Sequence, residues 1–214
     1  IVAPEIRPKE AEKIKKIAFD RGISFFSQPR QTSDNYQTFI AEIQSTGYDM
    51  IFSNCYSMII RPDILSFCSF NAINVHWSLL PLNRGPNPVQ WALINGSKMT
   101  GVTLHFMDEN LDSGDVIMSK QIEITDRETW VTLSRRLLEL SQLLIEEFFK
   151  NIKLYFLSRK SQNELIATKN FRINSDYPRI NFDKMTDLMV FNLVRAQVSP
   201  LKGAFIENDN KRKK

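Results

Sequence analysis

Strand-like and helical segments alternate along the first third of the sequence, and this pattern limits the fold more than any other feature. Residues 8–22 begin with proline, carry apolar side chains at helical spacing and end with glycine, which predicts a helix. Residues 23–29 and 48–56 are short and apolar, as buried strands are. A second helix is expected after a variant capping box formed by Asp34 and Gln37. The alternation predicts an α/β fold, with a Rossmann-like, mostly parallel sheet and flanking helices.

Strands and helices continue through the rest of the sequence. Residues 114–124 are expected to pair antiparallel with residues 100–108. A capping box of Thr125 and Glu128 is expected to begin the longest helix, whose apolar residues form one broad face. The elements predicted after residue 69 are a strand at 70–78, a helix at 88–96, strands at 100–108 and 114–124, and helices at 128–152 and 185–197.

Charge and composition narrow the functional classes. The net charge of the 214 residues is +4, but four positive charges lie at the end, in Lys211, Arg212, Lys213 and Lys214, so the remainder is balanced at +4 − 4 = 0. A uniformly basic surface for nucleic acid is therefore not indicated. The two cysteines lack CxxC spacing and lie among apolar residues, which predicts buried, reduced thiols. Because no apolar run reaches the ~18 residues of a membrane span and no signal peptide is visible, we expect a cytoplasmic protein without a membrane partner.

Two polar side chains interrupt the apolar strand expected at 70–78. Asn74 and His76 are two residues apart, so in a strand they project from the same face. They lie toward the carboxyl end of that strand, where open α/β sheets bind ligands, and a loop rich in proline and glycine follows. The sequence therefore predicts a functional site at this edge of the sheet.

An acidic segment downstream offers a partner for His76. A carboxylate placed against the imidazole would fix its tautomer and raise its pKa above the unperturbed value of about 6.5. Composition alone does not choose among the acids, and a solvated loop is the alternative. The candidates are Asp108, Glu109, Asp112 and Asp115.

Other interpretations of the polar residues have less support. His105, the other of the two histidines, lies in the middle of a predicted strand and is interpreted as a structural residue. A metal site is not predicted, because the sequence has no HxH, HExxH or paired cysteines, and asparagine is a poor ligand for transition metals. Ser78 lacks the GxSxG motif of serine nucleophiles.

The stretch NVHWSLLPLNRGPNPVQWALINGSKMTGVTLHFMDENLDSGDVI resembles the signature block of the formyltransferases that use 10-formyltetrahydrofolate. The family pattern is Asn-x-His followed by Ser-Leu-Leu-Pro, and then an aspartate inside a Leu-Asp-x-Gly turn. In this sequence the matching positions are Asn74, His76, residues 78–81 and Asp112. The resemblance covers residues 1–206 and is closest over 50–125. It implies the formyltransferase fold and an N-formyltransferase, a one-carbon transferase.

The resemblance also implies a role for each matched position. Asn74 and a protonated His76 would donate hydrogen bonds to the oxyanion that forms when an amine attacks the formyl carbon. Asp112 would keep His76 charged and help to move the amine proton. The cofactor implied is 10-formyltetrahydrofolate, and no metal is implied. The cofactor-binding residues implied are Met58, Ile59, Asp108, Asn110 and Asp112. The substrate-binding residues implied are Ser78, Arg84, Gly85 and Arg195, with a structural arginine as the alternative for Arg195.

The resemblance and the composition together divide the chain into three predicted regions. Residues 1–152 form the catalytic formyltransferase domain, which is expected to be shortened at its N-terminus because the sequence opens on what reads as the end of a strand. Residues 153–182 are polar and irregular, which predicts a linker or ordered loops. Residues 183–214 hold the last helix and the stub of a C-terminal region.

Three acceptors of the formyl group are compatible with the resemblance. A nucleotide-linked amino sugar comes first, because the stretches RGPNPVQWALING, NFRINSDYPRINF and NLVRA look more like the sugar-modifying branch, which includes the aminoarabinose formyltransferase domain of lipopolysaccharide biosynthesis. Methionyl-tRNA is the second, and water, as in formyltetrahydrofolate deformylase, is the third. A non-catalytic binding module would have no need for all three polar residues. The resemblance is also compatible with a homodimer.

Overall fold

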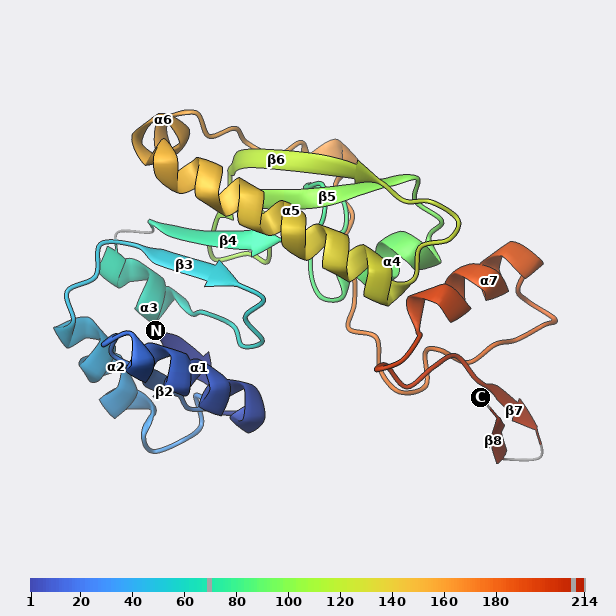
Figure 1. Ribbon diagram of the computed structural model, residues 1–214, viewed down its shortest axis with the longest axis horizontal. Helices are drawn as coiled ribbons and strands as arrows, with labels where there is room; N and C mark the ends of the chain where they lie inside the picture. The colour runs from blue at the N-terminus through green and yellow to red at the C-terminus, as the bar shows by residue number, and fades with distance from the viewer. Residues whose placement is uncertain (69–70, 209–210, 214) are drawn as a thin grey trace. The chain divides into compact units, whose positions relative to one another are not determined.

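The computed structural model describes residues 1–68, 71–208 and 211–213 of the chain. The fold is a mixed α/β arrangement, which confirms the class predicted from the alternating segments (Figure 1). The chain forms two compact units, residues 1–73 and 74–214. Each unit has its own buried apolar residues, so each is described in turn.

The first unit combines short parallel strands with helices. Strands β1 and β2 pair in parallel, with Val2 opposite Phe26. The amide of Ile51, at the start of β3, donates to the carbonyl of Asn71. Tyr36 and Phe39, from the second helix, belong to the apolar core of this unit. The elements are β1 (Val2–Pro4), α1 (Pro8–Asp20), β2 (Phe26–Gln28), α2 (Tyr36–Ser45), β3 (Ile51–Asn54), α3 (Pro62–Leu65) and the 3-10 helix η1 (Ser66–Cys68).

Two local predictions for the first unit are wrong. The N-cap of α2 is Asn35, which makes no side-chain capping bond, so the expected box of Asp34 and Gln37 does not form. Cys68 is buried as expected, but Cys55 is exposed, because it lies in the loop after β3 with a left-handed φ of 52°. Burial of this thiol depends on where the strand ends, which apolar composition alone does not define.

The second unit is built around β4, β5 and β6, in that order in the sheet. Strands β5 (Met99–Phe106) and β6 (Val116–Glu123) are antiparallel, as predicted, with a register shift between Leu104 and His105. Strand β4 (Ala72–His76) begins in the first unit and ends in the second. Its predicted start, Phe70, lies outside the described residues. Gly101 lets β6 approach β5, because a Cβ there would lie 2.1 Å from the carbonyl of Lys120.

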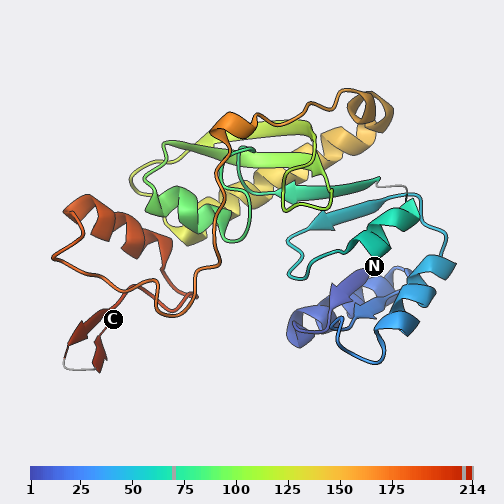
Figure 2. The same cartoon turned by 180° about the vertical axis from the view of Figure 1, so that it is seen from behind.

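Helix α5 (Trp130–Lys150) packs across one face of the β5 and β6 pair, as Figures 1 and 2 show. Its capping box consists of Thr129 and Thr132, not of Thr125 and Glu128 as predicted. The carboxylate of Glu128 instead accepts hydrogen bonds from Thr132 and Arg136. The buried face contains three of the four leucines expected there and belongs to the core of the second unit, while Leu140 is only half-buried. The residues of this face are Leu133, Leu137, Ser141, Leu144 and Phe148.

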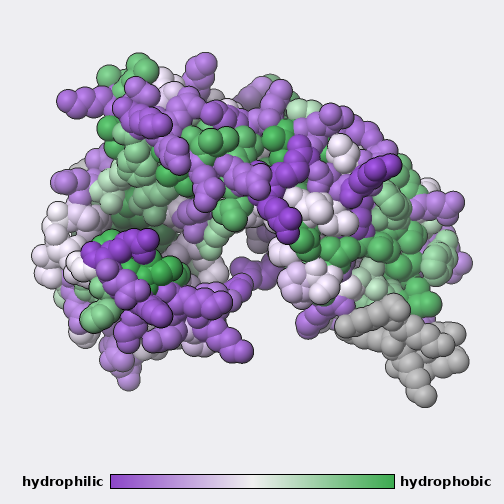
Figure 3. Space-filling model, in the orientation of Figure 1, coloured by the Kyte–Doolittle hydropathy of each residue, from purple (hydrophilic) through white to green (hydrophobic). Residues whose placement is uncertain are grey.

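The remaining elements of the second unit are short. They are α4 (Pro88–Ile94), α6 (Ile152–Leu157), the 3-10 helix η2 (Glu164–Ile166), α7 (Asp187–Ala196), β7 (Ile206–Asn208) and β8 (Lys211–Lys213). Three residues of the basic end of the chain form β8, while Lys214 lies outside the described residues. Apolar surface gathers over α7, where Leu188 and Phe191 are exposed (Figure 3). Among the helices of the described part, none is both long and apolar enough to cross a membrane.

Candidate active site

The end of β4 and the loop after it fix His76 in one orientation. The imidazole is buried, and its Nε2 lies 2.9 Å from the carbonyl oxygen of Asn83. A carbonyl only accepts hydrogen bonds, so the hydrogen is on Nε2 and the neutral ring carries its lone pair on Nδ1. The loop itself is tied to β5, because the hydroxyl of Thr103 donates to the carbonyl of Ser78 at 2.7 Å. The loop carbonyl of Asn83 therefore sets which nitrogen of His76 can take up a proton.

Asp112 is the acid that meets His76. Its Oδ2 lies 3.6 Å from His76 Nδ1, an ion-pair distance longer than a hydrogen bond, and accepts from the amide of Gly85 at 2.8 Å. The carboxylate is 9% exposed. Asp112 has a left-handed φ of 55°, an uncommon conformation for a residue with a side chain. Of the four acidic candidates, this one is brought to the imidazole by a strained turn.

Asn74 completes the predicted group and brings in His105. The amide Nδ2 of Asn74 lies 3.2 Å from His105 Nε2 and 3.4 Å from Asp112 Oδ1. His105 Nδ1 lies 2.7 Å from the carbonyl of Phe106, so its hydrogen is on Nδ1 and Nε2 accepts from Asn74 in the neutral ring. His105 Nε2 is also 3.4 Å from Asp112 Oδ1. Both histidines of the chain therefore face one carboxylate.

His105 is buried and hydrogen-bonded to the backbone, as expected of a structural residue, but it also contacts Asn74 and Asp112. The register shift between Leu104 and His105 lies where β5 runs toward the acidic turn, and such irregularities redirect side chains beside sites. Sequence spacing does not reveal such a shift. The available signal was position, since His105 precedes the acidic segment by only a few residues.

Burial reverses the predicted direction of the pKa of His76. Burial lowers the pKa of His76 below its ordinary value, and His105 lowers it further. The charge of Asp112 and the carbonyl of Asn83 raise it, but they do not offset burial. The expected pKa above 6.5 is therefore corrected, and the buried imidazole is neutral near pH 7.

Asp112 stays ionised in the same surroundings. Burial raises its pKa, but this is outweighed by the hydrogen bond with His105 and the charges of both imidazoles, which act when the rings are protonated, and by the amide of Gly85. Together they lower the pKa to about 2. A neutral imidazole with an open lone pair thus stands beside a carboxylate. This pair can accept a proton on the imidazole and stabilise the resulting charge.

The low pKa of Asp112 predicts a pH-dependent contribution to stability. The folded-state pKa of about 2 lies below the ordinary 3.8, so the ionised form stabilises the fold above about pH 4 and this contribution disappears as the pH falls through 2. The loss corresponds to about 2 kcal/mol. Urea unfolding of wild type and Asp112→Asn, at about pH 6 and about pH 2, measures it. Equal losses of stability in the two proteins would contradict the assignment.

Gly85 is required at the point where the loop meets Asp112. Its φ is +92°, and a Cβ there would lie 2.9 Å from the carbonyl of Asn170. Gly22 has a φ of +64° with nothing within 4 Å, so it is a matched control for backbone strain alone. We expect Gly22→Ala to lower the free energy of unfolding by about 1 kcal/mol, and Gly85→Ala by ~1–3 kcal/mol more. Denaturant unfolding measures both losses of stability. An equal loss in Gly22→Ala and Gly85→Ala would contradict the close contact at Gly85.

The other predicted substrate-binding residues have partners inside the second unit. The hydroxyl of Ser78 donates to the carbonyl of Leu82 at 2.7 Å. Arg195 is buried, and its guanidinium donates to Asn192 and to the carbonyl of Thr125. These bonds are typical of the structural role that was the alternative for Arg195. The guanidinium of Arg84 is also buried and bonded within the unit.

The predicted cofactor-binding residues are divided between the two units. In the second unit, the carboxylate of Asp108 accepts from the amide of Asn110 and from the hydroxyl of Ser113, which shapes the turn before Asp112. In the first unit, Met58 is half-buried and Ile59 is 77% exposed. Sequence reasoning located the turn but not the bonds that shape it.

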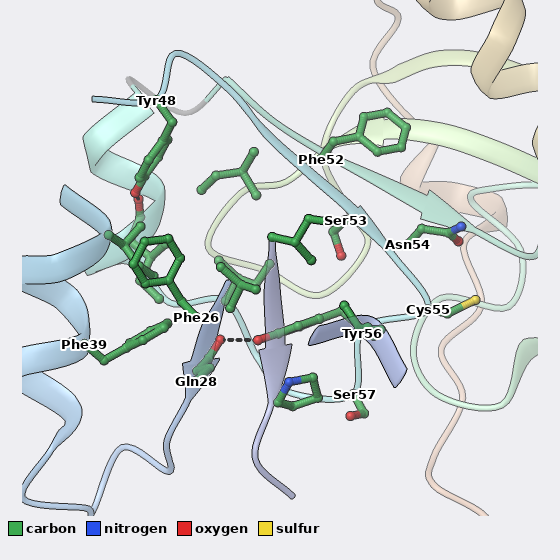
Figure 4. Close-up of a pocket in the computed structure, with 18 of the residues that line it drawn as sticks. Phe26, Gln28, Phe39, Tyr48, Phe52, Ser53, Asn54, Cys55, Tyr56 and Ser57 are labelled. Carbon is green, nitrogen blue, oxygen red and sulfur yellow. Dashed lines mark hydrogen bonds between the residues drawn. The ribbon is translucent and has the colours of Figure 1, made fainter. Parts of the chain in front are cut away.

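A cavity of about 650 Å³ lies in the first unit, beside the predicted cofactor segment (Figure 4). Tyr56 and Ser57 line it, and the hydroxyl of Tyr56 donates to Gln28 at 2.6 Å. The hydroxyl of Ser57 is buried and has no hydrogen-bond partner within the described residues. Within that same part of the chain, no group of three or more His, Cys, Asp or Glu side chains could hold a metal ion.

Comparison with known proteins agrees with the resemblance of the signature block. The formyl transferase family matches residues 6–147. Methionyl-tRNA formyltransferase of Thermodesulfovibrio yellowstonii is 35% identical over 186 residues, which are 87% of this chain and 59% of that protein. The chain spans less than two thirds of the length of this relative.

Solved structures share the fold. A 4-N formyltransferase from Francisella tularensis has a TM-score of 0.73 at 23% identity, covering 99% of this chain and 82% of that one. The sugar 3N-formyl transferase WlaRD, in the presence of dTDP and 5-N-formyl-THF, has a TM-score of 0.64 at 21% identity, covering 92% and 78%. Sequence match, fold and signature block agree, and this chain belongs to the formyl transferase family.

Proposed function

We propose that this site transfers a formyl group from 10-formyltetrahydrofolate to a primary amine, with Asn74, His76 and Asp112 as catalytic residues. The observation that carries the proposal is their convergence. Asp112 lies 38 positions after Asn74, yet its oxygens are 3.4 Å from the amide of Asn74 and 3.6 Å from the imidazole of His76. A buried acid beside a buried imidazole suits proton transfer during attack by an amine.

His76 is proposed to accept the proton that the attacking amine loses. Asn83 holds the Nε2 hydrogen, so Nδ1 is the nitrogen that can take up a proton, and Asp112 faces it. Asp112 stabilises the imidazolium without becoming protonated, because its own pKa is about 2. This arrangement replaces the protonated His76 that the resemblance implied. Base catalysis of this kind contributes a factor of about 10² to 10⁴ in rate.

Asn74 is proposed to stabilise negative charge on the formyl oxygen. One amide hydrogen is held by His105, which orients the group, while the bond to Asp112 is long at 3.4 Å. A long bond can be exchanged for a shorter one to an oxyanion. One donor of this type contributes a factor of about 10² to 10³ in rate.

The residues of the predicted cofactor segment fit a folate. When bound, the cofactor would supply the formyl group. The unpartnered hydroxyl of Ser57 lies next in sequence to Met58 and the exposed Ile59, so a polar atom adjoins apolar side chains. This combination suits a heteroaromatic ring with polar edges. In the second unit, Asp108, Asn110 and Asp112 are proposed as cofactor-binding residues on the basis of the family resemblance.

A nucleotide-linked amino sugar is the proposed acceptor, with methionyl-tRNA as the second candidate. The sugar is favoured by structural likeness over nearly the whole chain to formyltransferases such as WlaRD. It is also favoured by the three sequence stretches that look more like the sugar-modifying branch. The tRNA is favoured by the 35% identity with methionyl-tRNA formyltransferase. The sugar acceptor would give the enzyme a role in lipopolysaccharide biosynthesis in the cytoplasm.

Turnover assays distinguish these acceptors. The chain is incubated with 10-formyltetrahydrofolate and, separately, with nucleotide-linked amino sugars, methionyl-tRNA or buffer, and release of tetrahydrofolate is followed. We expect release only in the presence of an amino sugar, and formylation of its amine. Release only with charged tRNA would replace the sugar by the second candidate. Release in buffer alone would make the protein a deformylase and contradict the transferase proposal.

A further inference from the structure

Residues 160–173, which we call the strap, connect the two loops that carry the site. The segment follows α6 and passes beside the loop after β4 (Figure 2). Lys160 and Val116 exchange two backbone hydrogen bonds of 2.8 Å beside the Asp112 turn. Further along, Thr168 accepts from the amide of Asn83 through its hydroxyl, at 2.7 Å. Asn83 is the residue whose carbonyl holds His76, so the strap reaches both catalytic elements.

Gln162 makes the direct contact with the Asp112 turn. Its side-chain Nε2 donates to the carbonyl of Asp112 at 3.0 Å and to the carbonyl of Gly114 at 2.7 Å. Two carbonyls of one turn are therefore held by one amide group. Asp112, whose own carbonyl is one of the two, has a left-handed backbone, and its carboxylate lies against the amide of Gly85 and the imidazole of His76.

Arg84 fixes the orientation of the Gln162 amide. Its Nε and Nη2 donate to Gln162 Oε1 at 3.0 and 2.8 Å, so the oxygen faces Arg84 and the nitrogen faces the turn. Arg84 also forms a two-bond pair with Glu164, at 2.9 and 2.6 Å. Because these partners occupy the guanidinium, its geometry matches a supporting role better than contact with the acceptor. The side-chain oxygen of Gln162 is thus held by Arg84, and its nitrogen donates to the Asp112 turn.

We propose that Gln162 is a positioning residue for formyl transfer: it holds the Asp112 turn so that the carboxylate faces Nδ1 of His76. This inference rests on the proposed function. Gln162 lies outside residues 6–147, the part that matches the family, and in a segment that the sequence presents only as a linker or ordered loop. Without the two donors, the strained backbone of Asp112 has less to oppose its relaxation, and the carboxylate moves away from the imidazole.

Gln162→Met tests whether Gln162 holds the Asp112 turn. Methionine has a similar length but is neither a strong donor nor a strong acceptor of hydrogen bonds. We expect kcat to fall by a factor of about 10² through misplacement of Asp112, with KM little changed. We also expect the pKa of His76, followed by NMR titration, to fall, because Asp112 is the acidic group that raises it. His105 and the Asn83 carbonyl, the other groups facing His76, remain. Gln121→Met, an exposed glutamine on β6, is the control and should change neither readout.

A second variant separates the contact of Gln162 with Arg84 from its contact with the Asp112 turn. Gln162→Glu keeps an oxygen for Arg84 but cannot donate to the carbonyls, so it should lose as much kcat as the methionine variant if both fold. It also provides the test should Gln162→Met fail to fold. Wild-type kcat in Gln162→Glu would overturn the inference. So would a lower melting temperature of Gln162→Met with unchanged kcat and unchanged His76 titration, because this outcome describes a structural role only.

Failure of the proposed function is recognised separately. If the wild type releases no tetrahydrofolate with any acceptor, the transferase proposal fails. The NMR titration of His76 needs no turnover and still decides whether Gln162 holds Asp112 in place. An unchanged His76 titration in Gln162→Met would then by itself overturn the proposal that Gln162 positions Asp112.

Discussion

Replacement of His76 by glutamine should lower kcat for formyl transfer by a factor of about 10² to 10⁴. The amide nitrogen of glutamine can occupy the position of Nε2 and donate to the carbonyl of Asn83, so the loop keeps its anchor. What is lost is the basic Nδ1 that faces Asp112. Single-turnover release of tetrahydrofolate with an amine acceptor measures the effect, and a thermal melt shows that the variant is folded.

His76→Ala is the comparison for this variant, because it removes both the base and the loop anchor. If loss of the base is responsible, glutamine and alanine should be almost equally inactive. Wild-type turnover in His76→Gln would show that proton transfer at this position is not needed.

The pH profile gives an independent check on the same residue. The pKa of His76 is lowered by burial, and the proposed base is the neutral form, so kcat/KM should rise with pH through a pKa below 6.5 and then level off. A profile that falls as the pH rises through that value would instead require the imidazolium, as the family resemblance first suggested.

Asp112→Asn should lower kcat by a factor of about 10² to 10⁴, because the imidazolium of His76 loses its counter-charge. The new amide can also donate to Nδ1 and block the lone pair, since Oδ2 of the native side chain lies 3.6 Å from that nitrogen. The KM for the acceptor should change little, because the effect concerns charge that develops during the reaction. Steady-state kinetics with varied acceptor separate kcat from KM.

Asp126→Asn is a suitable control for loss of a carboxylate. Asp126 is 81% exposed and forms a surface ion pair with Lys98, so its replacement should leave both parameters unchanged. A loss of kcat in Asp112→Asn no larger than in Asp126→Asn would remove Asp112 from the proposed mechanism.

The sequence alone was sufficient for the features that depend on local pattern. Helical spacing and the antiparallel strand pair are visible in the order of apolar residues, and α5 buries three of the four predicted leucines. Asn74 and His76 share a strand face because the side-chain period is two. Asp112, by contrast, was selected from four acids by the family signature, since composition treats them alike.

Tertiary structure decided the features that depend on distant segments and on burial. His105 joins Asn74 and Asp112 because of a register shift in β5, and Gln162 meets the Asp112 turn because the strap returns to it. The pKa of His76 is lowered instead of raised, because desolvation outweighs the neighbouring charge. Residue order records spacing along the chain, but desolvation and hydrogen-bond partners depend on which segments fold against each other.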